Sequence, residues 1–112
     1  MNINLEELTF EIHTNAVEKG FWAIKKNEDL ANQILAKMML IDTEVSELAD
    51  AYVKSQGSET ILKEFSDIII RLLDLYAAMQ RYRIVEEGKL SETLLNKIAY
   101  NKTRPAKHNR LM

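Results

Sequence analysis

The chain has 112 residues, of which 46% are hydrophobic and 29% charged, with a formal net charge of -2 and no cysteine. This composition is typical of one soluble globular domain spanning residues 1–112, and the lack of cysteine excludes disulfides, thiolate metal ligands and thiol nucleophiles. No segment approaches the roughly 20 apolar residues of a membrane span and the first residues lack a signal-peptide pattern, so we expect a cytoplasmic protein without a membrane partner.

Four helices are expected, because the chain holds one proline and three glycines and its apolar residues recur with helical period. Gly20 is suited to end the first helix, and either Asn27 or Asp29 to cap the second. Gly57 is expected just after the second helix, with Ser58 as the N-cap of the third. The pattern predicts an all-α, four-helix bundle-like fold with helices at about residues 5–19, 29–55, 59–86 and 91–101.

The charge is unevenly spread along the chain. Residues 1–96 carry 10 basic and 17 acidic side chains, whereas residues 97–112 carry five basic side chains and no acidic one. The basic C-terminal tail, residues 102–112, is therefore either a solvated terminus or an anion-binding segment. The acidic body and the shortness of the tail argue against nucleic-acid binding.

Carboxylates occupy positions on helix faces where apolar residues are expected. On the second helix Glu44 falls inside the apolar stripe, and Glu47 lies at the edge of that stripe one turn later. The third helix repeats the arrangement, with Glu64 inside its stripe and Asp67 at the edge. Each helix therefore offers a pair of carboxylates from its inward face.

The two pairs can meet if the helices form an antiparallel hairpin, because both lie at similar distances along the chain from Gly57. Buried like charges are costly unless something neutralises them. A set of oxygen ligands suits Mg²⁺, with Mn²⁺ as a substitute. The alternative is that Lys37 and Arg71, which lie on the same faces, neutralise the carboxylates through ion pairs without a metal.

The spacing of these residues resembles a known signature. Glu44-x-x-Glu47 and, after a gap of 16 residues, Glu64-x-x-Asp67 resemble the metal-binding motif of the MazG-like all-α nucleoside triphosphate pyrophosphohydrolases. The family often has a glutamate at the position of Thr43, which projects from the stripe, so we expect the site to survive and leave the number of metal ions open. Further segments similar to the family are residues 16–22 and 97–108.

The resemblance implies Mg²⁺-dependent cleavage of a nucleoside triphosphate between its α- and β-phosphates, which gives a monophosphate and pyrophosphate. It implies that Glu44, Glu47, Glu64 and Asp67 hold the metal. Glu44 and Glu47 would be the catalytic residues, with Glu47 taking the proton from the attacking water.

The resemblance also implies contacts to the rest of the nucleotide. The base would contact Trp22 and His13, although Trp22 is equally suited to anchor a core or an interface and His13 to lie on a helix surface. The phosphates would be bound by Lys97, Asn101, Arg104 and Lys107.

The third helix carries Ile69, Ile70 and Leu73 outside the stripe that holds Glu64, so it is apolar nearly all round. Such a helix requires a partner on every side, which predicts a homodimer or a dimer of dimers. The rival hypothesis is a non-catalytic helical protein–protein interaction module. Within the enzyme hypothesis the preferred base and sugar stay open, and nucleotide-pool cleaning is the role that a chain without an appended domain suggests.

Overall fold

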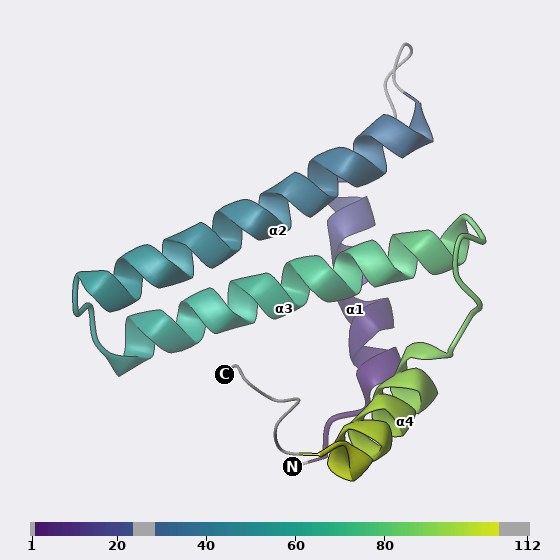
Figure 1. The fold of residues 1–112 in the computed structure, drawn as a ribbon. Helices are drawn as coiled ribbons and strands as arrows, with labels where there is room; N and C mark the ends of the chain where they lie inside the picture. Colours follow the sequence, from purple (N-terminus) through teal and green to yellow (C-terminus); the bar gives the residue numbers. More distant parts are fainter. Residues whose placement is uncertain (1, 24–28, 106–112) are drawn as a thin grey trace.

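The computed structural model describes residues 2–23 and 29–105, and all regular structure in these ranges is helical. The predicted all-α class with four helices is confirmed (Figure 1). The helices are α1 (Leu5–Glu18), α2 (Leu30–Val53), α3 (Ser58–Arg81) and α4 (Leu90–Thr103).

The helices form an open arrangement rather than a closed bundle. Helices α2 and α3 run antiparallel as a long hairpin, α1 crosses α3, and α4 packs on α1 (Figure 1). The radius of gyration is 16.5 Å, compared with about 13 Å for a compact domain of this length. The hairpin therefore projects well beyond the part of the molecule that α1 covers.

Side-chain caps set the start of the first two helices. The Asn4 side chain accepts a hydrogen bond from the backbone N–H of Glu7 at 3.0 Å, and Asp29 accepts one from Asn32 at 2.8 Å. These bonds satisfy helix N–H groups that have no intrahelical partner. Asp29 is thus the N-cap of α2, while Asn27 lies outside the described residues.

The turn between α2 and α3 differs from the prediction. Ser55, at φ 55°, takes the left-handed position after α2, and the N–H of Gln56 reaches back to the carbonyl of Ala51 at 3.0 Å. Gly57, at φ 93°, is the N-cap of α3, and Ser58 is its first helical residue. The predicted roles of Gly57 and Ser58 were wrong because Ser55, not Gly57, takes the left-handed position after α2.

Helix α3 ends at Arg81, five residues before the predicted end at residue 86. Arg83 adopts φ 61°, and the N–H of Ile84 bonds to the carbonyl of Met79 at 2.8 Å. This C-terminal motif usually contains glycine, so an arginine in it gives no sequence signal. Helix α4 lies within two residues of its predicted bounds.

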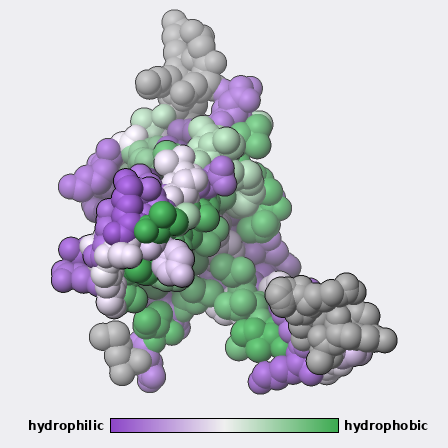
Figure 2. Space-filling view, turned by 60° about the vertical axis from the view of Figure 1, so that its left-hand side comes forward, coloured by the Kyte–Doolittle hydropathy of each residue, from purple (hydrophilic) through white to green (hydrophobic). Residues whose placement is uncertain are grey.

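The core is small and lies where α1, the connector and both hairpin helices meet. Its buried residues are Trp22, Ile34, Leu75 and Ala78. Towards the hairpin turn, large apolar side chains stay exposed, and Figure 2 shows such hydrophobic surface on one face of the molecule. One chain alone therefore leaves much of its apolar surface in water.

Candidate metal and nucleotide site

Helices α2 and α3 carry the four predicted carboxylates. Glu44 and Glu64 are half-buried, whereas Glu47 and Asp67 are exposed. This burial agrees with the sequence pattern, in which the first residue of each pair lies inside the apolar stripe and the second at its edge. The hairpin geometry therefore gives each helix one inner and one outer carboxylate.

Repulsion between carboxylates is visible at Glu44. Burial raises the pKa of Glu44, and so do its hydrogen bond to Glu47 and the negative charges of Glu47 and Asp67, while the Arg71 guanidinium acts in the opposite direction. Side chains of both helices thus act on one carboxyl group. The structure brings Glu47 and Asp67 within electrostatic range of Glu44.

Glu64 carries the clearest sign of an unmet interaction. Its Oε2 atom is buried and has no hydrogen-bond partner among the described residues. A buried carboxylate oxygen without a partner costs free energy that only a cation, a proton or a donor can recover. Glu64 lies one turn from Asp67 on α3, so a cation that contacted Glu64 would lie close to Asp67.

Ion pairs do not neutralise these carboxylates in the part of the chain that the structure describes. The pairs within 4.0 Å there are His13–Asp74, Lys54–Asp50, Lys63–Glu59 and Lys89–Glu92.

Lys37 and Arg71, which were the alternative partners predicted for the carboxylates, lie against an aromatic ring. The Nζ atom of Lys37 lies 3.4 Å from the Phe21 ring centroid and donates to the Phe21 carbonyl at 2.7 Å. The Arg71 guanidinium lies 4.8 Å from the same ring. Arg71 therefore acts on Glu44 at longer range than a direct ion pair.

The four predicted donors are carboxylates, which a hard divalent cation prefers, and one of them holds a buried oxygen without a partner among the described residues. No group of three or more Asp, Glu or His side chains in residues 2–23 and 29–105 lies in an arrangement that could already hold a metal ion. Binding would therefore require the carboxylates to turn towards a common centre.

The two predicted base-binding residues belong to a buried polar cluster. The indole Nε1 of Trp22 donates to both carboxylate oxygens of Asp74, at 2.9 and 2.8 Å, and Nδ1 of His13 lies 2.8 Å from Asp74 Oδ1. Trp22 is 5% exposed and Asp74 4%. Trp22 therefore has the core role that the sequence left open, and base contact by Trp22 and His13 stays a prediction.

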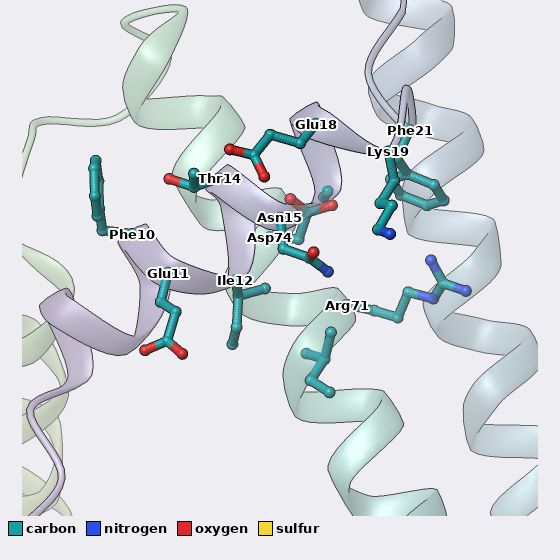
Figure 3. A pocket seen from close by; sticks show the side chains of 12 residues that line it. Phe10, Glu11, Ile12, Thr14, Asn15, Glu18, Lys19, Phe21, Arg71 and Asp74 are labelled. Carbon is teal, nitrogen blue, oxygen red and sulfur yellow. The ribbon is translucent and has the colours of Figure 1, made fainter.

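A groove of about 750 Å³ lies between α1 and α3. Figure 3 shows Phe21, Lys19 and Arg71 on one side of this groove and Phe10 on the other. Arg71, which lines the groove, is also the cation that acts on Glu44, whereas none of the four predicted carboxylates lines the groove. Its remaining lining residues are Glu11, Ile12, Thr14, Asn15, Ala16, Glu18, Ile70 and Asp74.

The predicted phosphate-binding residues lie apart from the carboxylates. Lys97, Asn101 and Arg104 are exposed at and beyond the middle of α4, and the charged groups of Lys97 and Arg104 lie 5.2 and 5.9 Å from the Tyr100 ring centroid. Among the described residues α4 packs on α1, and it meets the hairpin at its first residue, where the Leu90 N–H donates to the Tyr76 hydroxyl of α3. Lys107 lies outside the described residues.

Sequence analysis missed Asp74, which joins α1, the connector and α3. The available signal was a single acid within the apolar C-terminal half of α3. A buried acid needs donors, and Trp22 and His13 are the donors that the fold supplies. The partner residues could not be assigned from spacing, because they lie 52 and 61 positions away.

Compared with protein families, curated proteins and solved structures, the chain gave no match. Of the helices in the described ranges, none combines the length and apolarity needed to cross a membrane.

Proposed function

We propose that this protein is a Mg²⁺-dependent nucleoside triphosphate pyrophosphohydrolase. The observation that carries the proposal is the buried Oε2 of Glu64, which has no partner among the described residues, on the hairpin where Glu47 and Asp67 repel Glu44. A structural role would be expected to leave such groups paired. A cation-binding role accounts for carboxylates that form no ion pair within the described part of the chain.

On this proposal the half-buried and the exposed carboxylates have different roles. Bound Mg²⁺ supplies charge neutralisation at the phosphate oxygens and lowers the pKa of a coordinated water. Glu44 and Glu64, being half-buried, would hold the inner side of the ion, and Asp67 the outer side. Glu47 is exposed at the edge of the stripe, and on this proposal it would accept a proton from the attacking water.

The groove between α1 and α3 is where we place the nucleoside. It is lined by aromatic and aliphatic side chains together with polar groups such as Asn15 and Thr14, which suits a flat heterocycle and a sugar. Arg71 stands between this groove and Glu44, where its guanidinium would contact the phosphates.

We propose that a second copy of the chain completes the enzyme. Exposed apolar residues on α3 recur at three- and four-residue spacing, which is the seam pattern of packed helices. A matching row lies on α2. These residues are Leu62, Phe65, Ile69 and Leu72 on α3, and Met38, Val45 and Tyr52 on α2.

Such a dimer would also give the basic side chains of α4 a role. Because α4 packs on α1 and meets the hairpin at Tyr76 rather than at the carboxylates, Lys97, Asn101 and Arg104 would contact phosphates bound by a partner subunit. On this proposal Arg104→Ala raises the KM for the nucleotide with little change in metal binding.

The exposed seam also favours a second candidate, a non-catalytic module that binds another helical protein through α2 and α3. The two candidates differ in what the carboxylates do. A module has no need of Mg²⁺, whereas the enzyme loses all activity in EDTA.

The direct test is to incubate the pure protein with Mg²⁺ and single canonical or modified nucleoside triphosphates and to assay pyrophosphate and orthophosphate in parallel. Pyrophosphate release that EDTA abolishes would support the proposal and identify the preferred base. Orthophosphate in its place would mean cleavage at the γ-phosphate. No product from any nucleotide would favour the interaction module.

A further inference from the structure

The start of α4 is held by a polar cluster contributed by α1 and α3. Tyr76 donates its hydroxyl to Glu6 Oε1 at 2.9 Å, and Ser91 donates both its backbone N–H and its hydroxyl to Glu6 Oε2, at 3.1 and 2.8 Å. The backbone N–H of Leu90 donates to the Tyr76 hydroxyl at 3.1 Å. We refer to Glu6, Tyr76, Leu90 and Ser91 as the Glu6 cluster.

This cluster replaces a cap that α4 lacks. The N-cap residue of α4 is Lys89, whose side chain makes no capping hydrogen bond. The first two helical N–H groups, of Leu90 and Ser91, are instead satisfied by Tyr76 and Glu6 from two other helices. The Glu6 carboxylate also places negative charge at the positive end of the helix dipole.

Little else holds α4 in place in the described part of the chain. Its large apolar residues Leu94, Leu95 and Ile98 are 47%, 66% and 44% exposed, and beyond the hydrogen bond from Leu90 to Tyr76 its packing within the described residues is on α1. The direction in which α4 leaves the body is therefore set near its first turn. The hydrogen bonds of Glu6 are strong enough to outweigh its desolvation, since the net effect lowers the pKa of its carboxyl group.

We infer that Glu6 is a positioning residue, which acts through Tyr76 and Ser91 to set the orientation of α4 and hence the place of Lys97, Asn101 and Arg104. Its effect on nucleotide binding rests on the proposed function. Its effect on the order of α4 does not, because that follows from the cluster alone.

The test compares Glu6→Gln with Glu7→Gln. The second variant makes the same change of charge one residue later, at an exposed position on α1. In Glu6→Gln we expect amide hydrogen exchange in residues 91–101 to quicken roughly ten-fold or more, while exchange in α2 and α3 stays at the wild-type rate. Tyr76→Phe, which removes one hydroxyl and keeps the ring, should quicken exchange to a smaller extent.

Kinetics distinguish positioning from a merely structural contact. The KM for the nucleotide should rise several-fold in Glu6→Gln with kcat within about two-fold of wild type, and Glu7→Gln should change neither. Wild-type exchange rates in α4 of both Glu6→Gln and Tyr76→Phe would overturn the inference. Faster exchange with an unchanged KM would overturn the positioning role while the hydrolase stands. Faster exchange in a protein that hydrolyses no nucleotide would instead contradict the proposed function and uphold the role of Glu6 in ordering α4.

Discussion

Glu44 is the carboxylate of the proposed site on which like charges act most clearly. Burial and the neighbouring charges of Glu47 and Asp67 raise its pKa, so its ionised form is disfavoured in the folded chain. Without a bound cation, the hairpin holds carboxylates that repel one another. The cost of that repulsion is a property of the apo protein that can be measured separately from catalysis.

Glu44→Gln should therefore stabilise the metal-free protein. Relief of a like-charge contact is worth about 0.2–0.5 kcal/mol, which corresponds to a rise in Tm of roughly 1–4 °C. Mg²⁺ should raise the Tm of the wild type and have little effect on the variant. A lower Tm for Glu44→Gln in EDTA would show that Glu44 is paired rather than repelled.

The exposed carboxylates should matter for activity and hardly at all for folding. We expect Glu47→Ala and Asp67→Ala to lower kcat by at least about 100-fold, because each removes a proposed ligand and Glu47 the proposed base. Circular dichroism should show unchanged helix content. Asp42→Ala, on the exposed side of α2, is the matched control, and its activity should equal that of the wild type.

At the scale of helices, Asp74 ties α3 to α1 and to the connector that follows α1. The Asp74 carboxylate accepts hydrogen bonds from the Trp22 indole N–H and lies within hydrogen-bond distance of His13 Nδ1. Asp74 is nearly fully buried. The small hydrophobic core surrounds this cluster. The crossing of α1 over α3 therefore depends on polar contacts as well as on apolar packing.

Asp74→Ala should lower the free energy of unfolding by about 1–3 kcal/mol, because it leaves the buried indole N–H without an acceptor. Trp22→Phe in the same background should recover part of that loss, since it removes the unpaired donor. Asp50→Ala, which removes an exposed partner of Lys54, should cost less than about 0.5 kcal/mol. Urea unfolding of the four proteins measures all three effects, and an Asp74→Ala variant as stable as the wild type would contradict this account of the crossing.

The anchoring of α4 should weaken in acid. Desolvation opposes ionisation of Glu6, but hydrogen bonds from Ser91 and Tyr76 outweigh it, and the pKa of Glu6 falls below its ordinary value of 4.5. A carboxyl group with a lowered pKa stabilises the fold above its unfolded pKa, and that contribution is lost as the pH falls through the folded pKa.

The difference in Tm between wild type and Glu6→Gln should accordingly be largest at neutral pH and vanish below the lowered pKa. Tyr76 and, near it, Glu87 are the other titratable groups that act on this cluster. Tyr76 stays neutral over this range because its pKa is raised. A difference that persisted unchanged into strong acid would show that Glu6 acts without its charge.

The element types followed from sequence because helical periodicity is a local property. The ends were less predictable wherever left-handed residues other than glycine were used. Ser55 and Arg83 follow the last residues of α2 and α3 by two positions and have φ near 60°. Neither residue type predicts this conformation. Gly20 has φ 81°, and it lies just after α1, as expected from its conformational freedom.

At the scale of the whole molecule, the hairpin leaves large apolar side chains in water. Ile69 is 48% exposed and Leu72 47%, although both lie on the helix that packs against α2. An exposed apolar face of this kind is typical of an interaction surface, and we propose that a second copy of the chain covers it. The open shape and the large radius of gyration have the same explanation in our proposal of a dimer.

Ile69→Glu should dissociate the proposed dimer, because burying an unpaired charge in the seam costs several kcal/mol and weakens association by at least about 100-fold. Ile3→Glu, at a position 71% exposed ahead of α1, is the control and should leave association unchanged. Sedimentation velocity at micromolar concentration measures both. A wild-type protein that sediments as a monomer would contradict the dimer.

Part of the candidate site was predictable because helical periodicity, a local property of the sequence, sets which residues share a helix face. The register of Glu44, Glu47, Glu64 and Asp67 is set by helical period and by the position of one turn, and the structure places all four on the hairpin. The location of α4 and the pairing of Asp74 depend on contacts between residues far apart in the chain. Spacing along the sequence carries no information about such contacts.

The central claim is that the hairpin carboxylates form a divalent-cation site, and calorimetric titration of Mg²⁺ into the metal-free protein tests it most directly. We predict saturable binding to the wild type and to Asp42→Ala, and binding at least about ten-fold weaker in Glu64→Gln, which removes the charge of the carboxylate whose Oε2 is buried without a partner among the described residues. Absence of binding to the wild type, or equal affinity of the wild type and Glu64→Gln, would contradict the claim.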